Sequence, residues 1–190
     1  MRALLLSFAF LALAAAPALA QIKAQARSGS VPPWDKGILP IGQESYWSAV
    51  ECGKQGGQDP PCVFWDTGLC KNEDFTLAMY TPYKMVAYEV WGAVRQKKEA
   101  PTPNYQRAQQ TRITVGITPV RGSKNPLKEF VLKRAGKPVA PVSKAVATGD
   151  ARYTFDYPAF AATANITFDM VGETKTISCS IDQSVLKQFR

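Results

Sequence analysis

The four cysteines constrain the fold more than any other feature of this sequence. Cys52, Cys62 and Cys70 lie in one stretch, residues 52–70, that is rich in Gly, Pro and Asp, and Cys179 lies near the far end. In an exported chain an even number of cysteines predicts disulfides, here two, and four cysteines allow three pairings. Every pairing joins Cys179 to the cluster, so one bridge must link the two halves of the chain. In the entropic model, closing so long a loop restricts the unfolded chain and thereby stabilises the folded protein by roughly 4–5 kcal/mol.

A zinc site is the alternative use of four cysteines. Sites of this kind pair their ligands at C-x2-4-C spacing, and the spacings in residues 52–70 do not fit. The sequence therefore predicts no metal and no cofactor.

The N-terminal residues have the pattern of a secretory signal peptide. Arg2 precedes an apolar run over residues 3–16, and small residues at 17–20 predict cleavage after Ala20. No later run reaches the roughly 20 apolar residues that a membrane span needs. We therefore expect a periplasmic or extracellular protein whose mature chain has no membrane span, in an oxidising place that suits disulfides.

The charge balance favours anionic partners and the composition narrows the chemistry. The net charge is +8; after Arg2 leaves with the signal peptide, 22 basic residues stand against 15 acidic ones, which gives +7. Such a charge suits an anionic envelope polymer or an acidic protein, although it also serves solubility. Histidine is absent, which removes Ser-His and Cys-His pairs and histidine metal sites. The catalytic groups that this composition still allows are a carboxylate pair, a Ser-Lys dyad or a free thiol.

The first half of the chain predicts an arm followed by a helical lobe. Residues 21–42 are rich in Pro, Gly and Ser and indicate an extended arm. Residues 43–99 form the lobe that contains the cysteine loop, with a helix over 43–54 whose apolar face holds Tyr46, Ala49, Val50 and Gly53. A second helix is expected over 82–98, capped by Thr81 and begun by Pro82. Lys84 lies on another side of this helix than its apolar stripe. Residues 75–80, which precede the helix, fit either helix or strand.

The second half predicts strands. After a linker at 100–110, apolar residues alternate over 111–118, and shorter strands follow at 129–133, 139–147 and 153–155. Short strands separated by Gly and Pro breaks indicate an antiparallel β-sandwich, here Ig-like, over 111–190 with a short C-terminal helix. The expected fold class is therefore α+β, with a disulfide-stapled N-terminal helical lobe packed on a C-terminal sandwich.

Residues 165–180 predict a hairpin. A two-residue turn at Gly172 and Glu173 would place Phe168 opposite Ile177 and Ile166 opposite Cys179, which pairs apolar residues with apolar ones. This arrangement turns Cys179 inward, so the long-range disulfide is expected to be buried between the sandwich and the helical lobe.

Two groups of residues are the candidate ligand-binding positions. Trp65 and Asp66 stand on the cysteine loop, where an aromatic ring beside an acid suits a rigid recognition tip, although burial of Trp65 is the competing interpretation. Arg112, Arg121 and Lys124 belong to a basic series that could form a cationic edge of the sandwich. That series lacks interleaved aromatic residues, so no nucleic-acid partner is expected.

We therefore expect an exported, non-catalytic binding or assembly module that recognises an anionic or protein partner of the cell envelope. One alternative is an enzyme that acts on cell-wall or extracellular glycan through carboxylates, with Glu51 and Asp66 as its candidates. Another is a structural subunit of a surface assembly.

Overall fold

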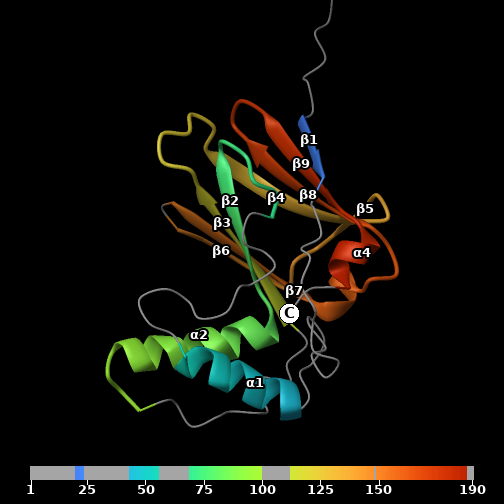
Figure 1. Cartoon of the computed structure of the whole chain (residues 1–190). Helices are drawn as coiled ribbons and strands as arrows, with labels where there is room; N and C mark the ends of the chain where they lie inside the picture. Colours follow the sequence, from blue (N-terminus) through green and yellow to red (C-terminus); the bar gives the residue numbers. More distant parts are fainter. Residues whose placement is uncertain (1–19, 24–42, 56–68, 100–111, 148, 188–190) are drawn as a thin grey trace, which may run out of the picture.

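The computed structural model describes residues 20–23, 43–55, 69–99, 112–147 and 149–187. These residues form an α+β fold with two β-sheets, a pair of helices and short helical turns (Figure 1). Apart from one parallel pairing at an edge, neighbouring strands in both sheets run antiparallel. The predicted α+β class is thereby confirmed. Residues 56–68, which include Cys62, Trp65 and Asp66, lie outside the described residues.

The four-stranded sheet has the order β2-β3-β7-β6. Its strands are β2 (Phe75–Tyr80), β3 (Arg112–Pro119), β7 (Asp150–Asp156) and β6 (Ser143–Ala147). Alternating apolar residues build it, because Ile113, Val115 and Ile117 of β3 are buried while their neighbours are not. Residues 75–80, which the sequence left open between helix and strand, are thus an edge strand of this sheet.

The five-stranded sheet has the order β1-β9-β8-β4-β5. It contains β1 (Ala20–Lys23), β9 (Thr176–Ile181), β8 (Ile166–Gly172), β4 (Leu127–Arg134) and β5 (Lys137–Val139). The parallel pair is β1 with β9, and Figure 1 shows β1 at the outer edge. The strand expected over 139–147 is wrong as a single element: β5 pairs with β4 and β6 with β7, in different sheets. Pro141 lies between them and has no amide hydrogen for a continuing ladder.

One hydrophobic core is shared by the two sheets. Phe130 of β4 packs against Tyr153 and Phe155 of β7, with ring centroids 5.2 and 6.2 Å apart. The disulfide between Cys70 and Cys179 lies in the same core, and both cysteines are buried. The predicted long-range bridge is confirmed, but its expected place beside the helices is wrong, because Cys70 leads into β2 and so belongs to the sheet core.

The hairpin of β8 and β9 forms with a register two residues away from the predicted one. Phe168 pairs with Cys179 and Ile166 with Ile181, and the turn spans residues 172–175, where the Gly172 amide donates to the Lys175 carbonyl over 3.0 Å. A shift of two residues keeps each side chain on its face, so apolar pairing could not detect it. Cys179 faces inward as expected.

The two long helices form a second, smaller apolar cluster. These helices, α1 (Gln43–Lys54) and α2 (Pro82–Arg95), lie side by side beyond one end of the sheets (Figure 1). Thr81 caps α2 and Pro82 begins it, as predicted; the Lys84 amide donates to the Thr81 hydroxyl over 3.2 Å. The cluster contains the expected face of α1, and Cys52, which is also disulfide-bonded, packs against it.

Two short helical turns complete the described chain. They are the 3-10 turn η1 (Tyr157–Phe160) after β7 and α4 (Gln183–Leu186) after β9. The predicted C-terminal helix is therefore confirmed; Val185 and Leu186 bury its apolar side in the sheet core.

Candidate functional site

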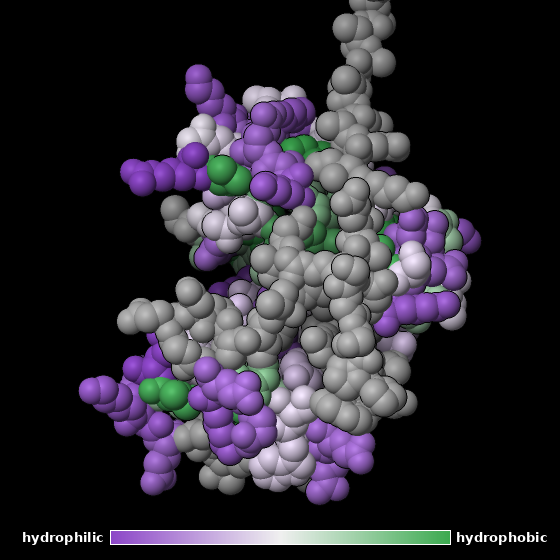
Figure 2. Space-filling model, viewed as in Figure 1, coloured by the Kyte–Doolittle hydropathy of each residue, from purple (hydrophilic) through white to green (hydrophobic). Residues whose placement is uncertain are grey.

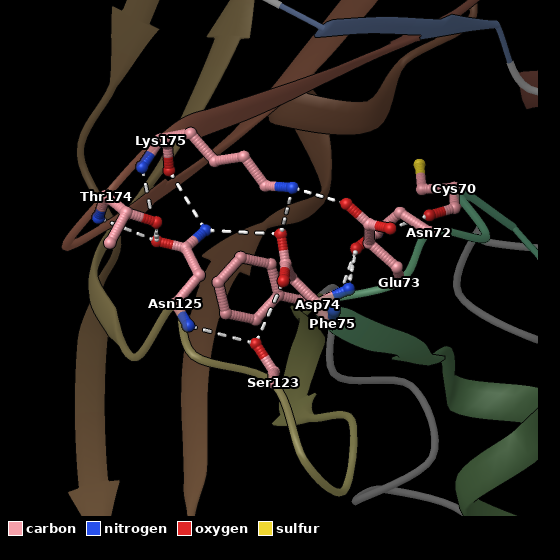
Figure 3. Close-up of polar contacts among 9 residues, drawn as sticks. All are labelled: Cys70, Asn72, Glu73, Asp74, Phe75, Ser123, Asn125, Thr174 and Lys175. Atoms are coloured by element: carbon pink, nitrogen blue, oxygen red, sulfur yellow. Dashed lines mark hydrogen bonds and ion pairs between the residues drawn. The ribbon is translucent and has the colours of Figure 1, made fainter.

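A polar cluster at one end of the sheets fixes three loops relative to one another (Figure 3). Asp74, which is buried, accepts a hydrogen bond from Ser123 over 2.9 Å and pairs with Lys175 over 3.0 Å. Asn125 links the other two loops, since its side-chain oxygen accepts from the amide and hydroxyl of Thr174, each over 2.9 Å. Burial raises the pKa of the Asp74 carboxyl, but hydrogen bonds from Lys175, Ser123 and Asn125 outweigh it and leave that pKa below its usual value. Because its donors and acceptors are matched, this cluster supports the fold.

The cluster holds in place the loop that carries two of the predicted ligand-binding residues. Arg121 and Lys124 are exposed on this loop between β3 and β4, and Figure 2 shows long hydrophilic side chains projecting from the same end of the molecule. Arg112 lies at the opposite end of β3, roughly 25 Å away at about 3.3 Å per residue, and its guanidinium is 3.6 Å from Asp156. The structure therefore brings Arg121 and Lys124 together but not Arg112. Trp65 and Asp66 lie outside the described residues.

The outer face of the four-stranded sheet carries a hollow that sequence reasoning missed. It has a volume of about 100 Å³, is open to solvent and is lined by β2, β3 and β7. Ala78, Gly116 and Arg152 form one row across these strands, and Ala145 of β6 continues it. Ala78 and Gly116 of this row are small, so the sheet surface sinks between the larger side chains around them.

An aromatic ring, a guanidinium and a carboxylate surround this hollow. Tyr80 leans over Gly116, where a β-carbon would come within 3.2 Å of the ring. The Arg152 guanidinium lies 5.9 Å from the ring centroid of Tyr80. Asp150 accepts a hydrogen bond from the Thr118 hydroxyl over 2.6 Å. The site thus offers a planar cation, a ring face and an acceptor within one hollow.

The Arg152 charge is not neutralised by the part of the chain that the structure describes. Its guanidinium is exposed and forms no ion pair with a described residue, in contrast to Arg112, which pairs with Asp156. Guanidinium groups bind carboxylate, sulfate and phosphate through paired hydrogen bonds. This arrangement suits recognition of an anion.

A strip of rings and cations continues from the hollow onto α2. Lys84 lies 5.2 Å from the ring centroid of Tyr80 and 5.4 Å from that of Tyr88. The rings of Tyr88 and Trp91 are 5.5 Å apart, and the guanidinium of Arg95 lies 4.8 Å from the Trp91 ring. Lys84 lies on another side of α2 than the apolar stripe, as predicted, and its side chain is buried between two rings.

The alternation in residues 150–156 was the signal that could have identified part of this site. With Ala151, Tyr153 and Phe155 inward, Asp150 and Arg152 must point outward from the same strand. The place of Tyr80 could not be read in this way, because its strand was not assigned and its pairing with β3 is a long-range choice.

Of the two catalytic candidates, the described residues include only Glu51. Glu51 is exposed on α1 and pairs with Lys54 over 2.7 Å, and Asp66 lies outside the described residues. Among the described residues no three His, Cys, Asp or Glu side chains are placed to hold a metal ion. The helices in this part of the chain are all too short or too polar to cross a membrane.

No protein-family model matches the sequence, and no curated protein shows significant similarity to it.

Proposed function

We propose that this protein is an exported, non-catalytic binding module, periplasmic or secreted, that recognises an anionic partner of the cell envelope. Its binding site is the hollow on the outer face of the four-stranded sheet. The Arg152 guanidinium, which lies beside the Tyr80 ring and forms no ion pair with a described residue, is the observation that carries this proposal. A basic chain attracts anionic partners over distance, and Arg152 then fixes an anionic group in place.

Binding to envelope extracts tests this function. Purified mature protein is expected to retain an anionic component at low salt and to lose it at high salt, because screening weakens contacts between exposed charges. Arg152→Gln should reduce retention at least about tenfold, the effect of losing about 1.4 kcal/mol. Arg112→Gln is the matched control: it removes the same charge from an exposed position of the same sheet and should change retention little. An equal loss of retention in both variants would show that net charge alone controls binding, and it would contradict the proposed site.

The finer fold expectation, an Ig-like sandwich with a helical lobe packed on it, is part of this proposal. Strand order supports it. In an Ig domain one sheet has the order A-B-E-D and the other G-F-C, extended by C′ in variable domains. Taken along the chain as A, B, C, C′, D, E, F and G, strands β2 to β9 fall into A-B-E-D and G-F-C-C′. On this mapping α2 is an insertion between strands A and B.

A second candidate function, a subunit of a surface assembly, rests on β6. This strand is an edge of the four-stranded sheet, all five of its residues are exposed, and Val146 retains 69% of its accessible surface. Open edge strands can pair with another chain. We propose that β6 of a second copy of the protein pairs with this edge. Antiparallel pairing of the two β6 strands, centred on Ala145, would set Lys144 opposite Val146 and not opposite another lysine.

A cysteine placed at the centre of that pairing tests the assembly. Directly opposed residues of antiparallel strands have β-carbons about 4.5–5.5 Å apart, so Ala145→Cys should yield a disulfide-linked dimer under mild oxidation. Lys144→Cys, which would face Val146, is the control and should not. A monomer at high concentration that fails to cross-link would remove this candidate.

A further inference from the structure

The strip of rings and cations on α2 has a direction and a length that bear on what the site binds. We infer that the ligand of the hollow is an extended acidic polysaccharide, which continues from Arg152 along α2 to Arg95. This inference rests on the proposed function and specifies its ligand. It is carried by the geometry of α2 and by the spacing of its exposed guanidinium groups.

The helix α2 has two distinct long stripes. Tyr83, Ala87 and Val90 are buried in the cluster with α1. The residues of the other stripe follow one another at intervals of three or four and therefore share one side of the helix; they are Lys84, Tyr88, Trp91 and Arg95. Tyr80, one residue before the cap, joins this stripe to the hollow, because its ring lies 6.5 Å from that of Tyr88.

The contacts along the strip hold its members in fixed positions. Lys84 is buried and bridges two rings, so it orients Tyr80 and Tyr88. The two guanidinium groups at the ends, those of Arg152 and Arg95, are exposed and each rests on a ring. The strip therefore presents two anion-binding groups separated by partly exposed aromatic surface.

The distance between those groups requires a chain as ligand. From Lys84 to Arg95 the helix rises about 16 Å at 1.5 Å per residue, and the hollow lies beyond the Lys84 end. One monosaccharide cannot span this length, whereas a short oligosaccharide can. Sugar rings have apolar C–H faces that suit the aromatic surface between the charges.

The sparse charge distinguishes a polysaccharide from a nucleic acid. A nucleic-acid strand carries one phosphate per about 3.4 Å of axis and calls for a cationic groove along its whole length. The rings on α2 also meet edge to face, at interplanar angles of 80° and 69°, so they do not form a row of parallel platforms for successive bases. A uronate-containing chain places carboxylates along its length, with the apolar faces of its sugar rings between them, so it can reach both guanidinium groups and cover the aromatic surface that separates them.

Oligogalacturonates of defined length provide the test, with calorimetry at low salt as the readout. The octamer should bind the mature protein at least about tenfold more tightly than the dimer, as a second set of contacts on one chain requires. Arg95→Gln and Trp91→Ala should abolish this gain with length, so that the octamer binds these variants no more tightly than the dimer does. Arg152→Gln should weaken both ligands. Lys98→Gln, beyond the C-terminal end of α2, removes one charge outside the strip and should change neither affinity.

The outcomes separate this inference from the proposed function. If dimer and octamer bind equally and both depend on Arg152, the extended ligand is wrong and the hollow remains an anion site. Tighter binding of a single-stranded oligonucleotide of equal charge would also overturn the polysaccharide. If neither galacturonate binds, this ligand class is excluded, while retention of an envelope component that depends on Arg152 would still support the proposed function. Unchanged circular dichroism of each variant shows that the fold is intact.

Discussion

At the scale of single residues, the buried carboxylate of Asp74 makes the stability of the protein depend on pH. Its pKa is lowered in the folded state, because hydrogen bonds and the Lys175 charge together outweigh burial. A group with a lowered folded pKa stabilises the fold above its unfolded value, about 3.9, and this contribution is lost as pH falls through the folded value. We therefore expect the free energy of unfolding to decrease in acid below about pH 4.

Urea unfolding at pH 7 and at pH 3 measures this contribution. Asp74→Asn should lower the stability at pH 7 and flatten its decline in acid, since the substituted side chain does not titrate. Asp156→Asn is the control, because that carboxylate is exposed and its pairing with Arg112 over 3.6 Å is loose. A decline in acid that persists unchanged in Asp74→Asn would assign the pH dependence to other carboxylates.

Residue-scale reasoning from the sequence identified the caps and the inward residues but not the polar partners. Thr81 and Pro82 act within a single turn, so their roles follow from local chemistry. Asn125 lies in a loop and its partners are about fifty positions away, at Asp74 and Lys175. No local pattern specifies such a partner. The amides of Thr174 and Lys175 donate to Asn125, and the turn closes at 172–175, one residue beyond the expected turn at Gly172 and Glu173.

At the scale of elements, the crossing of α1 and α2 depends on one glycine. A β-carbon at Gly53 would lie 2.5 Å from the Ala87 carbonyl oxygen and 2.7 Å from the β-carbon of Val90. In an open helix position alanine is more stable than glycine by roughly 0.5–1 kcal/mol. Here overpacking should reverse the sign, and we expect Gly53→Ala to cost about 1–3 kcal/mol.

The same helix pair offers a control of opposite sign. Among the described residues, no atom beyond the backbone of α2 itself lies within 4 Å of the position of a β-carbon added at Gly92. Gly92→Ala should therefore stabilise the protein by roughly 0.5–1 kcal/mol. Thermal and chemical denaturation of both variants measure the two effects. If Gly53→Ala were as stabilising as Gly92→Ala, the close approach of the helices would be disproved.

The type of several elements followed from periodicity, whereas the partners of the elements did not. The apolar face of α1 and the alternation of β3 were readable because each repeats within its own segment. The sheet that each strand joins could not be read from the sequence: β5 and β6 are consecutive in the chain yet belong to different sheets. The candidate site depends on that choice, because Arg152 meets Tyr80 only once β2 and β7 flank β3.

At the scale of the whole molecule, the disulfide between Cys70 and Cys179 joins residues separated by 109 positions. It ties the segment before β2 to β9, and β2 and β9 belong to different sheets. The pair therefore cross-links the two sheets as well as the halves of the chain. Both cysteines are buried in the shared core, so their replacement also removes packing.

We expect a double Cys70→Ala and Cys179→Ala variant to lose roughly 2–5 kcal/mol of stability. The shared core should keep the two sheets together, so the variant should remain folded at low temperature with the far-ultraviolet circular dichroism of the native protein. Guanidinium unfolding gives the loss, and Val185→Ala, which removes buried apolar surface without a cross-link, is the control for packing. The disulfide constrains the unfolded chain, so the double variant should also show a larger denaturant dependence of the unfolding free energy. An unchanged dependence together with a loss equal to that of Val185→Ala would assign the whole effect to packing.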